Sequence, residues 1–321
     1  MSLQHWTARG VVAALVAATG AALAQDFPAR PITISVPFTA GGPADTAART
    51  ISDALRRQLG QSLVIENRPG ASGIPAVEAV VHGEPDGYTL LLGGIAPIVL
   101  IPPIQKVRYD VEKDLAPLGL IWRSPQVFAV SAKLGVSTVA EFVVRAKANP
   151  NKLTIGSAGN GTVTHLANEL LRREAGIDFV HVPYRSTANS LTDLVGGHID
   201  AIFGDVAILE PQVQAGAIKA LAITSTERSS LLPGLGTTAE VGFPKVQTEV
   251  WYGLLAPARA PAPVLARLET AVANAQRDPA FREALGKYGI NPPPAGREFF
   301  ATFIREEAAR WTPIVQSVKM N

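Results

Sequence analysis

The sequence predicts an α/β protein in which helices cover mostly parallel sheets. Two observations predict this class. Short apolar segments rich in β-branched residues alternate with amphipathic helical patterns along most of the chain. Breaks that contain glycine or proline separate the segments, which is typical of repeated β-α-β units. No repeat of solenoid length and no low-complexity tract interrupts the alternation.

The alternation begins soon after the N-terminus and continues to the C-terminus. We expect strands at residues 31–38, 63–66, 88–92, 128–131, 154–156, 179–182, 199–203, 220–224 and 251–255. We expect helices at about residues 44–59, 76–81, 138–148, 164–174, 188–195, 263–277, 279–287 and 297–318.

The first residues have the features of a secretory signal peptide. Arg9 is the only Lys or Arg before the apolar run Val11–Ala24, and Ala22-Leu23-Ala24 forms a small-x-small cleavage site. The run is shorter than the roughly 20 residues that a membrane-spanning helix needs. We therefore expect a signal peptide at residues 1–24 that is cleaved after Ala24. An uncleaved membrane anchor is the alternative.

Composition limits what the secreted chain can be. The remaining chain of roughly 300 residues corresponds to about two domains. The full sequence is 47% hydrophobic and 17% charged, and its net charge of +2 is too weak to predict nucleic acid or an anionic membrane as a partner. The absence of cysteine excludes disulfides, thiol nucleophiles, cysteine-ligated metals and a lipid-modified N-terminal cysteine.

Two glycine-rich loops, each between an expected strand and an expected helix, are the candidate binding sites. They span residues 37–45 and 156–162. In open α/β sheets, ligands bind beyond the carboxyl ends of the strands, where such loops lie. Glycines let backbone N–H groups approach a ligand, and a helix N-terminus adds partial positive charge. The loops therefore predict an anion site without a cationic side chain, or, alternatively, are only tight turns.

A series of longer segments identifies the family that this chain resembles. They follow one another along nearly all of the mature chain: PARPITISVPFTAGGPADTAAR, LGQSLVIENRPGASG, PDGYTLLLG, ANPNKLTIGSAGNGTVTHLANEL, DFVHVPYRS, LTDLVGGHIDAIFGD, IKALAITSTERSSLLPG and WYGLLAPA. In content and order they resemble the tripartite tricarboxylate transporter receptors, also called Bug proteins. The GSAGNGT and HVPY segments are the most specific.

The resemblance implies a type II periplasmic-binding-protein fold, in which two Rossmann-like α/β lobes are joined by two crossover strands and the ligand cleft lies between them. We expect lobe 1 to comprise residues 25–126 and 250–321, and lobe 2 residues 127–249. The resemblance also implies a monomeric periplasmic receptor that is not an enzyme and uses no cofactor or metal. It would bind a small carboxylate, such as a dicarboxylate, an amino acid or an aromatic acid, and deliver it to membrane transporter subunits.

The resemblance carries over to particular positions of this sequence. Thr39, Ser157, Asn160 and Thr162 are the candidates for side-chain contacts with the ligand. The full set of implied ligand-binding residues is Phe38, Thr39, Ala40, Gly41, Gly42, Asp45, Gly94, Ser157, Ala158, Gly159, Asn160, Gly161, Thr162, His165, Tyr184 and Asp205.

Several of these residues have a plainer structural alternative. Asp45 either contacts an amino group of the ligand or pairs with Arg49 at i,i+4. His165 shares a helix face with Glu169, but no third metal ligand is evident, so we expect a histidine at a helix start. Asp205 either lines the cleft or caps a turn, and Tyr184 belongs either to the cleft or to the core.

The sequence also departs from the family pattern. Residues 94–102 (GIAPIVLIP) are largely apolar where relatives often carry a polar stretch, and residues 74–76 (IPA) and 185–186 (RS) differ as well. These changes predict a more hydrophobic wall on the lobe 1 side of the cleft. We therefore expect a ligand with an apolar or aromatic body rather than citrate.

Two other functions remain as alternatives. A secreted hydrolase would need a Gly-x-Ser-x-Gly elbow or a His-Glu-x-x-His motif, and the sequence contains neither. A binding protein that signals to a membrane sensor, instead of feeding a transporter, would have the same sequence features.

Overall fold

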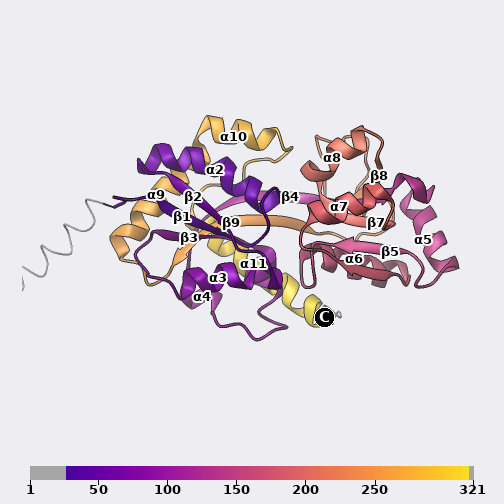
Figure 1. Ribbon diagram of the computed structural model, residues 1–321, viewed down its shortest axis with the longest axis horizontal. Helices are drawn as coiled ribbons and strands as arrows, with labels where there is room; N and C mark the ends of the chain where they lie inside the picture. Colours follow the sequence, from indigo (N-terminus) through magenta and orange to yellow (C-terminus); the bar gives the residue numbers. More distant parts are fainter. Residues whose placement is uncertain (1–26, 318–321) are drawn as a thin grey trace, which may run out of the picture.

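The computed structural model describes residues 27–317. The predicted signal peptide at residues 1–24 lies outside this range. The strands form two sheets that lie side by side along the long axis of the molecule, with β4 and β9 running between them (Figure 1). The strand order is β2-β1-β3-β9-β4-β7-β5-β6, and β8 also pairs with β4.

The first sheet and its helices form the half of the molecule that we call lobe 1. Strands β1 and β2 are parallel, as are β1 and β3, whereas β9 runs antiparallel to both of its neighbours. The strands are β1 (Ile32–Val36), β2 (Leu63–Asn67), β3 (Thr89–Gly94), β9 (Glu249–Pro257) and the first part of β4 (Leu115–Ser131). The helices are α2 (Pro43–Leu59), α3 (Ile74–Val81), α4 (Val111–Asp114), α9 (Ala262–Arg277), α10 (Pro279–Gly286) and α11 (Arg297–Ser317).

The second sheet and its helices form lobe 2. Strand β5 is parallel to β6 and β7, and the last part of β4 runs antiparallel to β7 and β8. The strands are β5 (Thr154–Ser157), β6 (Val180–Pro183), β7 (Ala201–Asp205) and β8 (Ile218–Ile223). The helices are α5 (Val139–Ala148), α6 (Val163–Ala175), α7 (Thr187–Gly196) and α8 (Val206–Gln214).

Strand β4 is a single 17-residue strand that belongs to both sheets. It pairs with β9 as far as Pro125 and with β7 from Gln126 onward. The sequence predicted only its last residues, because Pro117, Gly119 and Pro125 resemble strand breaks. Register shifts after Pro117 and Leu120 absorb these residues within a continuous strand. The two lobes therefore share one continuous strand, which crosses from the first sheet to the second.

Smaller elements also differ from the sequence prediction. Helix α8 was not predicted, because it is short and contains Pro211. A turn of π-helix at Ala96–Leu100 follows β3, where the sequence predicted only an apolar wall. Between residues 27 and 317, the helices are all too short or too polar to cross a lipid bilayer.

Candidate functional site

A cavity lies between the two lobes, with walls from both. It measures about 550 Å³, counted out to the solvent at its mouth. Its lining is largely apolar with a few polar groups, which is the usual character of a small-molecule site. The lining residues are Phe38, Gly42, Pro43, Ile95, Ala96, Gln126, Ala158, Thr162, Val163, Thr164, Ser186, Thr187, Asp205, Val250 and Tyr252.

Helix N-termini from both lobes reach this cavity. In lobe 1, α2 begins at Pro43, and Gly42 supplies no side-chain cap. In lobe 2, α6 begins at Val163, α7 at Thr187 and α8 at Val206, each directly after a strand or its loop. Because the first amides of a helix lack intrahelical acceptors, such ends favour a bound anion.

Amides without an acceptor in the described part of the chain lie at the start of α7, at Thr187 and Ala188, and also at the starts of α2 and α6, which face each other across the lobes. The N–H groups of Gly42 and Ala44 at the start of α2 donate to no acceptor among residues 27–317. The same holds for Val163 and Thr164 at the start of α6. No Lys, Arg or His of the described part of the chain, residues 27–317, lines the cavity. A negative group placed between α2 and α6 would therefore be solvated by main-chain dipoles and not by a salt bridge.

Three glycine amides of the two loops donate hydrogen bonds within the protein. The N–H of Gly41 donates to Asp45 Oδ2 at 3.1 Å, and that of Gly161 donates to His165 Nδ1 at 3.2 Å. The N–H of Gly159 donates to Ser157 Oγ at 3.1 Å. Gly41, Gly161 and Gly159 have φ of +81°, +73° and +124°. These three glycines therefore shape the loops.

Asp45 accepts hydrogen bonds from the first loop and from its own helix. Its carboxylate also accepts two hydrogen bonds from Arg49, at 2.8 Å to Oδ2 and 3.1 Å to Oδ1. Burial raises the pKa of Asp45, but the hydrogen bonds from Arg49 and Gly41 outweigh it and hold the pKa below its ordinary value. Of its two alternative roles, the geometry favours the i,i+4 pair.

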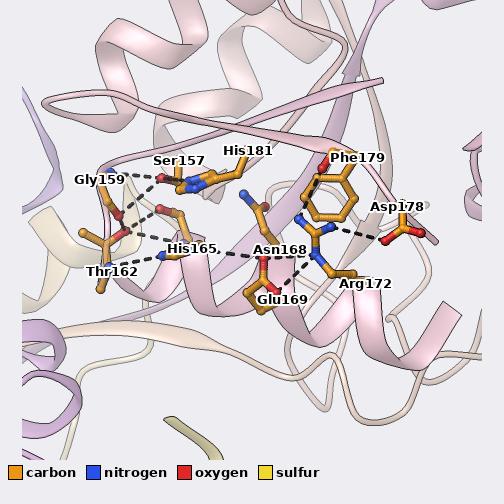
Figure 2. A network of polar contacts seen from close by, with 12 residues as sticks. Ser157, Gly159, Thr162, His165, Asn168, Glu169, Arg172, Asp178, Phe179 and His181 are labelled. Atoms are coloured by element: carbon orange, nitrogen blue, oxygen red, sulfur yellow. Dashed lines mark hydrogen bonds and ion pairs between the residues drawn. The ribbon is translucent and has the colours of Figure 1, made fainter. Parts of the chain in front are cut away.

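Two stacked histidines support the second loop from behind (Figure 2). The rings of His165 and His181 lie 4.0 Å apart and are inclined by only 8°. His181 Nε2 lies 2.7 Å from Ser157 Oγ, which itself accepts from the Gly159 amide. His165 is 2% exposed and serves the loop through Gly161, not the ligand cavity. The pair therefore fixes the loop's shape.

Both histidines are held in the neutral form. Burial lowers the pKa of His165 to about 3, with further contributions from His181 and Arg172. Burial also lowers the pKa of His181 to about 4, again helped by Arg172. Glu169 Oε1 lies 3.9 Å from His165 Nε2, but Arg172 pairs with the same carboxylate. Among residues 27–317, no group of three or more His, Cys, Asp or Glu could hold a metal ion.

The two lobes touch beside the cavity, at a second opening that shares Phe38 and Ala158 with it. Ser72 Oγ of lobe 1 donates a hydrogen bond to the main-chain oxygen of Asn160 in lobe 2. Gly159 and Tyr184 line the same opening. The Tyr184 hydroxyl donates to Asp193 at 2.6 Å, and burial together with this contact raises its pKa to about 12. Tyr184 is thus a half-buried residue of the rim.

We expect Ser72→Ala to weaken ligand binding about two- to tenfold. The Ser72–Asn160 hydrogen bond exists only when the lobes are together, and a net hydrogen bond contributes about 0.5–1.5 kcal/mol. Isothermal titration of both proteins with the same ligand measures the difference. The melting temperature of the ligand-free protein should stay unchanged, and an unaltered affinity would show that this contact does not stabilise closure.

Gln126, Asp205 and Tyr252 form the floor of the cavity. Gln126 and Asp205 are partners in the β4–β7 pairing. Asp205 is 3% exposed, lines the cavity and also caps α8 by accepting from the Ala207 amide at 3.0 Å. Both roles left open for Asp205 are therefore present. Gly94 lies beneath Tyr252, since a Cβ there would approach the tyrosine ring to 2.9 Å.

The cavity contains only part of the predicted set. Phe38, Gly42, Ala158, Thr162 and Asp205 line it. The others lie in the loops, behind them, at the rim or under the floor: Thr39, Ala40, Gly41, Asp45, Gly94, Ser157, Gly159, Asn160, Gly161, His165 and Tyr184. Sequence reasoning missed Gln126 and Tyr252, which sit in strands that read as core. Ile95 and Ala96 come from the apolar stretch that predicted a hydrophobic wall.

Comparison with known proteins decides the family. The model of the tripartite tricarboxylate transporter family receptor matches residues 47–320. The chain belongs to this family. MatC from Rhodopseudomonas palustris, solved with bound malate, is similar at 32% identity and a TM-score of 0.85, over 90% of this chain and 100% of MatC. Rpa4515 from R. palustris, solved with adipate, is similar at 32% identity and a TM-score of 0.85, over 91% of this chain and 98% of Rpa4515.

A further solved relative is the periplasmic binding protein BugD, with 29% identity and a TM-score of 0.83 over 91% of this chain and 98% of BugD. Membership in a receptor family confirms the predicted resemblance, the periplasmic-binding-protein fold and the expectation of a binding protein over an enzyme.

Proposed function

We propose that this receptor captures a small carboxylate between its lobes, with the carboxylate group held at the N-termini of α2 and α6. One observation carries the proposal: these two helix starts come from different lobes, line one cavity and leave amides without acceptors among residues 27–317. The carboxylates malate and adipate in the solved relatives support the same ligand class. A ligand that bridges both lobes binds the closed state better and shifts the population toward it.

The apolar lining supports a ligand with an apolar or aromatic body. Phe38, Ile95, Ala96, Val250 and the ring of Tyr252 offer hydrophobic surface, and the cavity lining holds no cationic side chain for the further carboxylates of citrate. Burying an unpaired carboxylate against such a wall is costly. The ligand we propose therefore has one carboxylate at the helix starts and a hydrophobic middle.

The place and partners of the receptor form a second part of the proposal. We propose a periplasmic monomer, released by cleavage after Ala24, that delivers its ligand to the membrane subunits of a tripartite transporter. The periplasmic relative BugD and the family itself support this arrangement. We also propose lobe boundaries near residues 126 and 249, and the change of pairing partner along β4 between Pro125 and Gln126 supports the first of them. Mass determination of the secreted protein tests the cleavage position.

A thermal-shift screen of carboxylates against protein purified without refolding tests the proposed ligand class. We expect aromatic and aliphatic monocarboxylates to raise the melting temperature and citrate to leave it unchanged. Ligand trapped during expression is extracted and identified by mass spectrometry in parallel. A screen in which citrate alone stabilises the protein would contradict the proposal.

A further inference from the structure

The floor of the cavity carries polar groups that lie apart from the proposed carboxylate site. Gln126, Asp205 and Tyr252 all line it and are each at most 4% exposed. They lie together where β4 passes from one lobe to the other. Gln126 of β4 pairs with Asp205 of β7, and Trp122 of β4 pairs with Tyr252 of β9. The floor is thus a polar patch below an apolar wall.

Asp205 is an acceptor without a cationic partner among the described residues, 27–317. Its Oδ1 accepts from the Ala207 amide at 3.0 Å, and its Oδ2 accepts a long hydrogen bond of 3.4 Å from Trp122 Nε1. Burial raises the pKa of Asp205 to about 6, although hydrogen bonds from Ala207, Ser124 and Trp122 oppose the rise. At neutral pH the carboxylate is mostly ionised, with acceptor capacity left on Oδ2.

The two neighbours of Asp205 each keep an unpaired polar group. The amide oxygen of Gln126 accepts from the Thr248 hydroxyl at 2.8 Å, but its NH₂ group has no acceptor among residues 27–317. The Tyr252 hydroxyl likewise has no partner in that range. Within that range, Asn168 Oδ1 is the only fully enclosed side-chain nitrogen or oxygen atom without a hydrogen bond. The Gln126 and Tyr252 groups therefore reach the open space of the cavity.

We infer that the floor selects ligands that carry a hydrogen-bond donor, a hydroxyl or an amino group, at the end opposite the carboxylate, and that Asp205 is the residue that accepts from it. This inference rests on the proposed function, because it assumes that the carboxylate occupies the helix starts. The Gln126 NH₂ donates to the oxygen of a ligand hydroxyl, and the Tyr252 hydroxyl accepts from either a hydroxyl or an amino group. A second carboxylate on the ligand would meet the buried charge of Asp205, and two such charges repel strongly in a site without a cation.

Two matched ligand series test the inference by isothermal titration at pH 8. The first is hexanoate, 6-hydroxyhexanoate and adipate, and the second is benzoate, 4-hydroxybenzoate and terephthalate. Within each series only the distal group changes. In at least one series we expect the hydroxy acid to bind about tenfold more tightly than the plain acid, because a hydrogen bond to a charged group is stronger than a neutral one. We expect the dicarboxylate to bind more weakly than the plain acid.

Asp205→Asn isolates the carboxylate. Asparagine caps helices as well as aspartate does, so α8 keeps its start. Removal of a buried charge should leave the melting temperature at pH 8 no lower than that of the wild type. We expect the variant to lose most of the preference for the hydroxy acid and to bind the dicarboxylate at least tenfold better than the wild type does. Tyr252→Phe, which removes only the floor hydroxyl, should weaken the same preference.

The outcomes separate this inference from the proposed function. Tight binding of the plain acids with no preference for the hydroxy acids, or a preference that Asp205→Asn leaves intact, would overturn the inference and leave the carboxylate site standing. A dicarboxylate that binds best to the wild type would overturn it as well. Binding of none of the six acids would count against the proposed function, and the inference would fall with it.

Discussion

Gly161→Leu is expected to weaken ligand binding at least about fivefold while leaving each lobe folded. Gly161 lies in the second loop of lobe 2, and any side chain there would collide with Cδ1 of Ile101 in lobe 1. Ile101 is only 3% exposed, so it has little room to move aside. The clash arises only when the lobes are closed, and overpacking of this kind costs about 1–3 kcal/mol. Isothermal titration with the carboxylate identified by the thermal-shift screen measures the loss.

Two further variants make this expectation specific. Gly135 has the same φ of +73° in lobe 2 but faces open space where a Cβ would stand, so Gly135→Leu introduces the same backbone strain without the clash. It should bind ligand as the wild type does. Adding Ile101→Ala to Gly161→Leu should recover part of the lost affinity, because it removes the colliding atoms. Equal loss in the Gly135 and Gly161 variants would show that strain, and not closure, accounts for the effect.

The stacked histidines are expected to make the protein markedly less stable in mild acid. His165 and His181 have folded-state pKa values of about 3 and about 4, whereas the ordinary value is 6.5. As the pH falls below about 6.5, the two histidines of the unfolded chain take up protons, whereas those of the folded protein stay neutral. The free energy of unfolding therefore falls by about 1.4 kcal/mol per pH unit for each histidine, until the pH reaches the folded-state values.

Asp205 opposes this trend over a narrower range. Its pKa is raised from 3.8 to about 6, so the folded state holds the extra proton between those values and gains stability as the pH falls through them. Over this range, the gain in stability offsets the loss that one of the two histidines causes. The net loss of unfolding free energy between pH 6.5 and pH 4 is then somewhat more than that of one histidine, about 4 kcal/mol.

His181→Phe should reduce the loss of unfolding free energy in acid. Phenylalanine keeps a ring against His165 but cannot take up a proton, so urea midpoints between pH 7 and pH 4.5 should fall less steeply than in the wild type. Ser157→Ala is the matched control, since it removes the same hydroxyl–imidazole contact of 2.7 Å and keeps both histidines. It should lower stability by about 1 kcal/mol at every pH. An acid profile in His181→Phe identical to that of the wild type would contradict this account of the pair.

The sequence predicts the loops of this site better than its floor. Residues 37–45 and 156–162 stand out because glycines follow strands and precede helices, and both loops do reach the cavity. Gln126 and Tyr252 lie inside strands that read as core, so local pattern gives no sign that they face a cavity. Only the crossing of β4 between the sheets brings Gln126 beside Asp205, and pairing between distant strands is not visible in local periodicity.

The pairing of the loop amides was also beyond sequence reasoning. In both loops, a glycine N–H donates to a side chain four residues later, Asp45 in lobe 1 and His165 in lobe 2. The sequence shows a carboxylate and an imidazole near a helix start, and both patterns fit a ligand contact equally well. The side-chain directions that decide the matter depend on Arg49 and on the stack with His181. The same local motif thus serves the shape of the loop in each lobe.

In the complex that we propose, main-chain amides from both lobes, and no cationic side chain, hold the carboxylate of the ligand. A crystal structure of the protein with its bound carboxylate tests this most directly. We predict carboxylate oxygens within about 3 Å of amides at the start of α2, Gly42 or Ala44, and at the start of α6, Val163 or Thr164. A carboxylate bound to an Arg or Lys side chain, or contacting only one lobe, would contradict the claim.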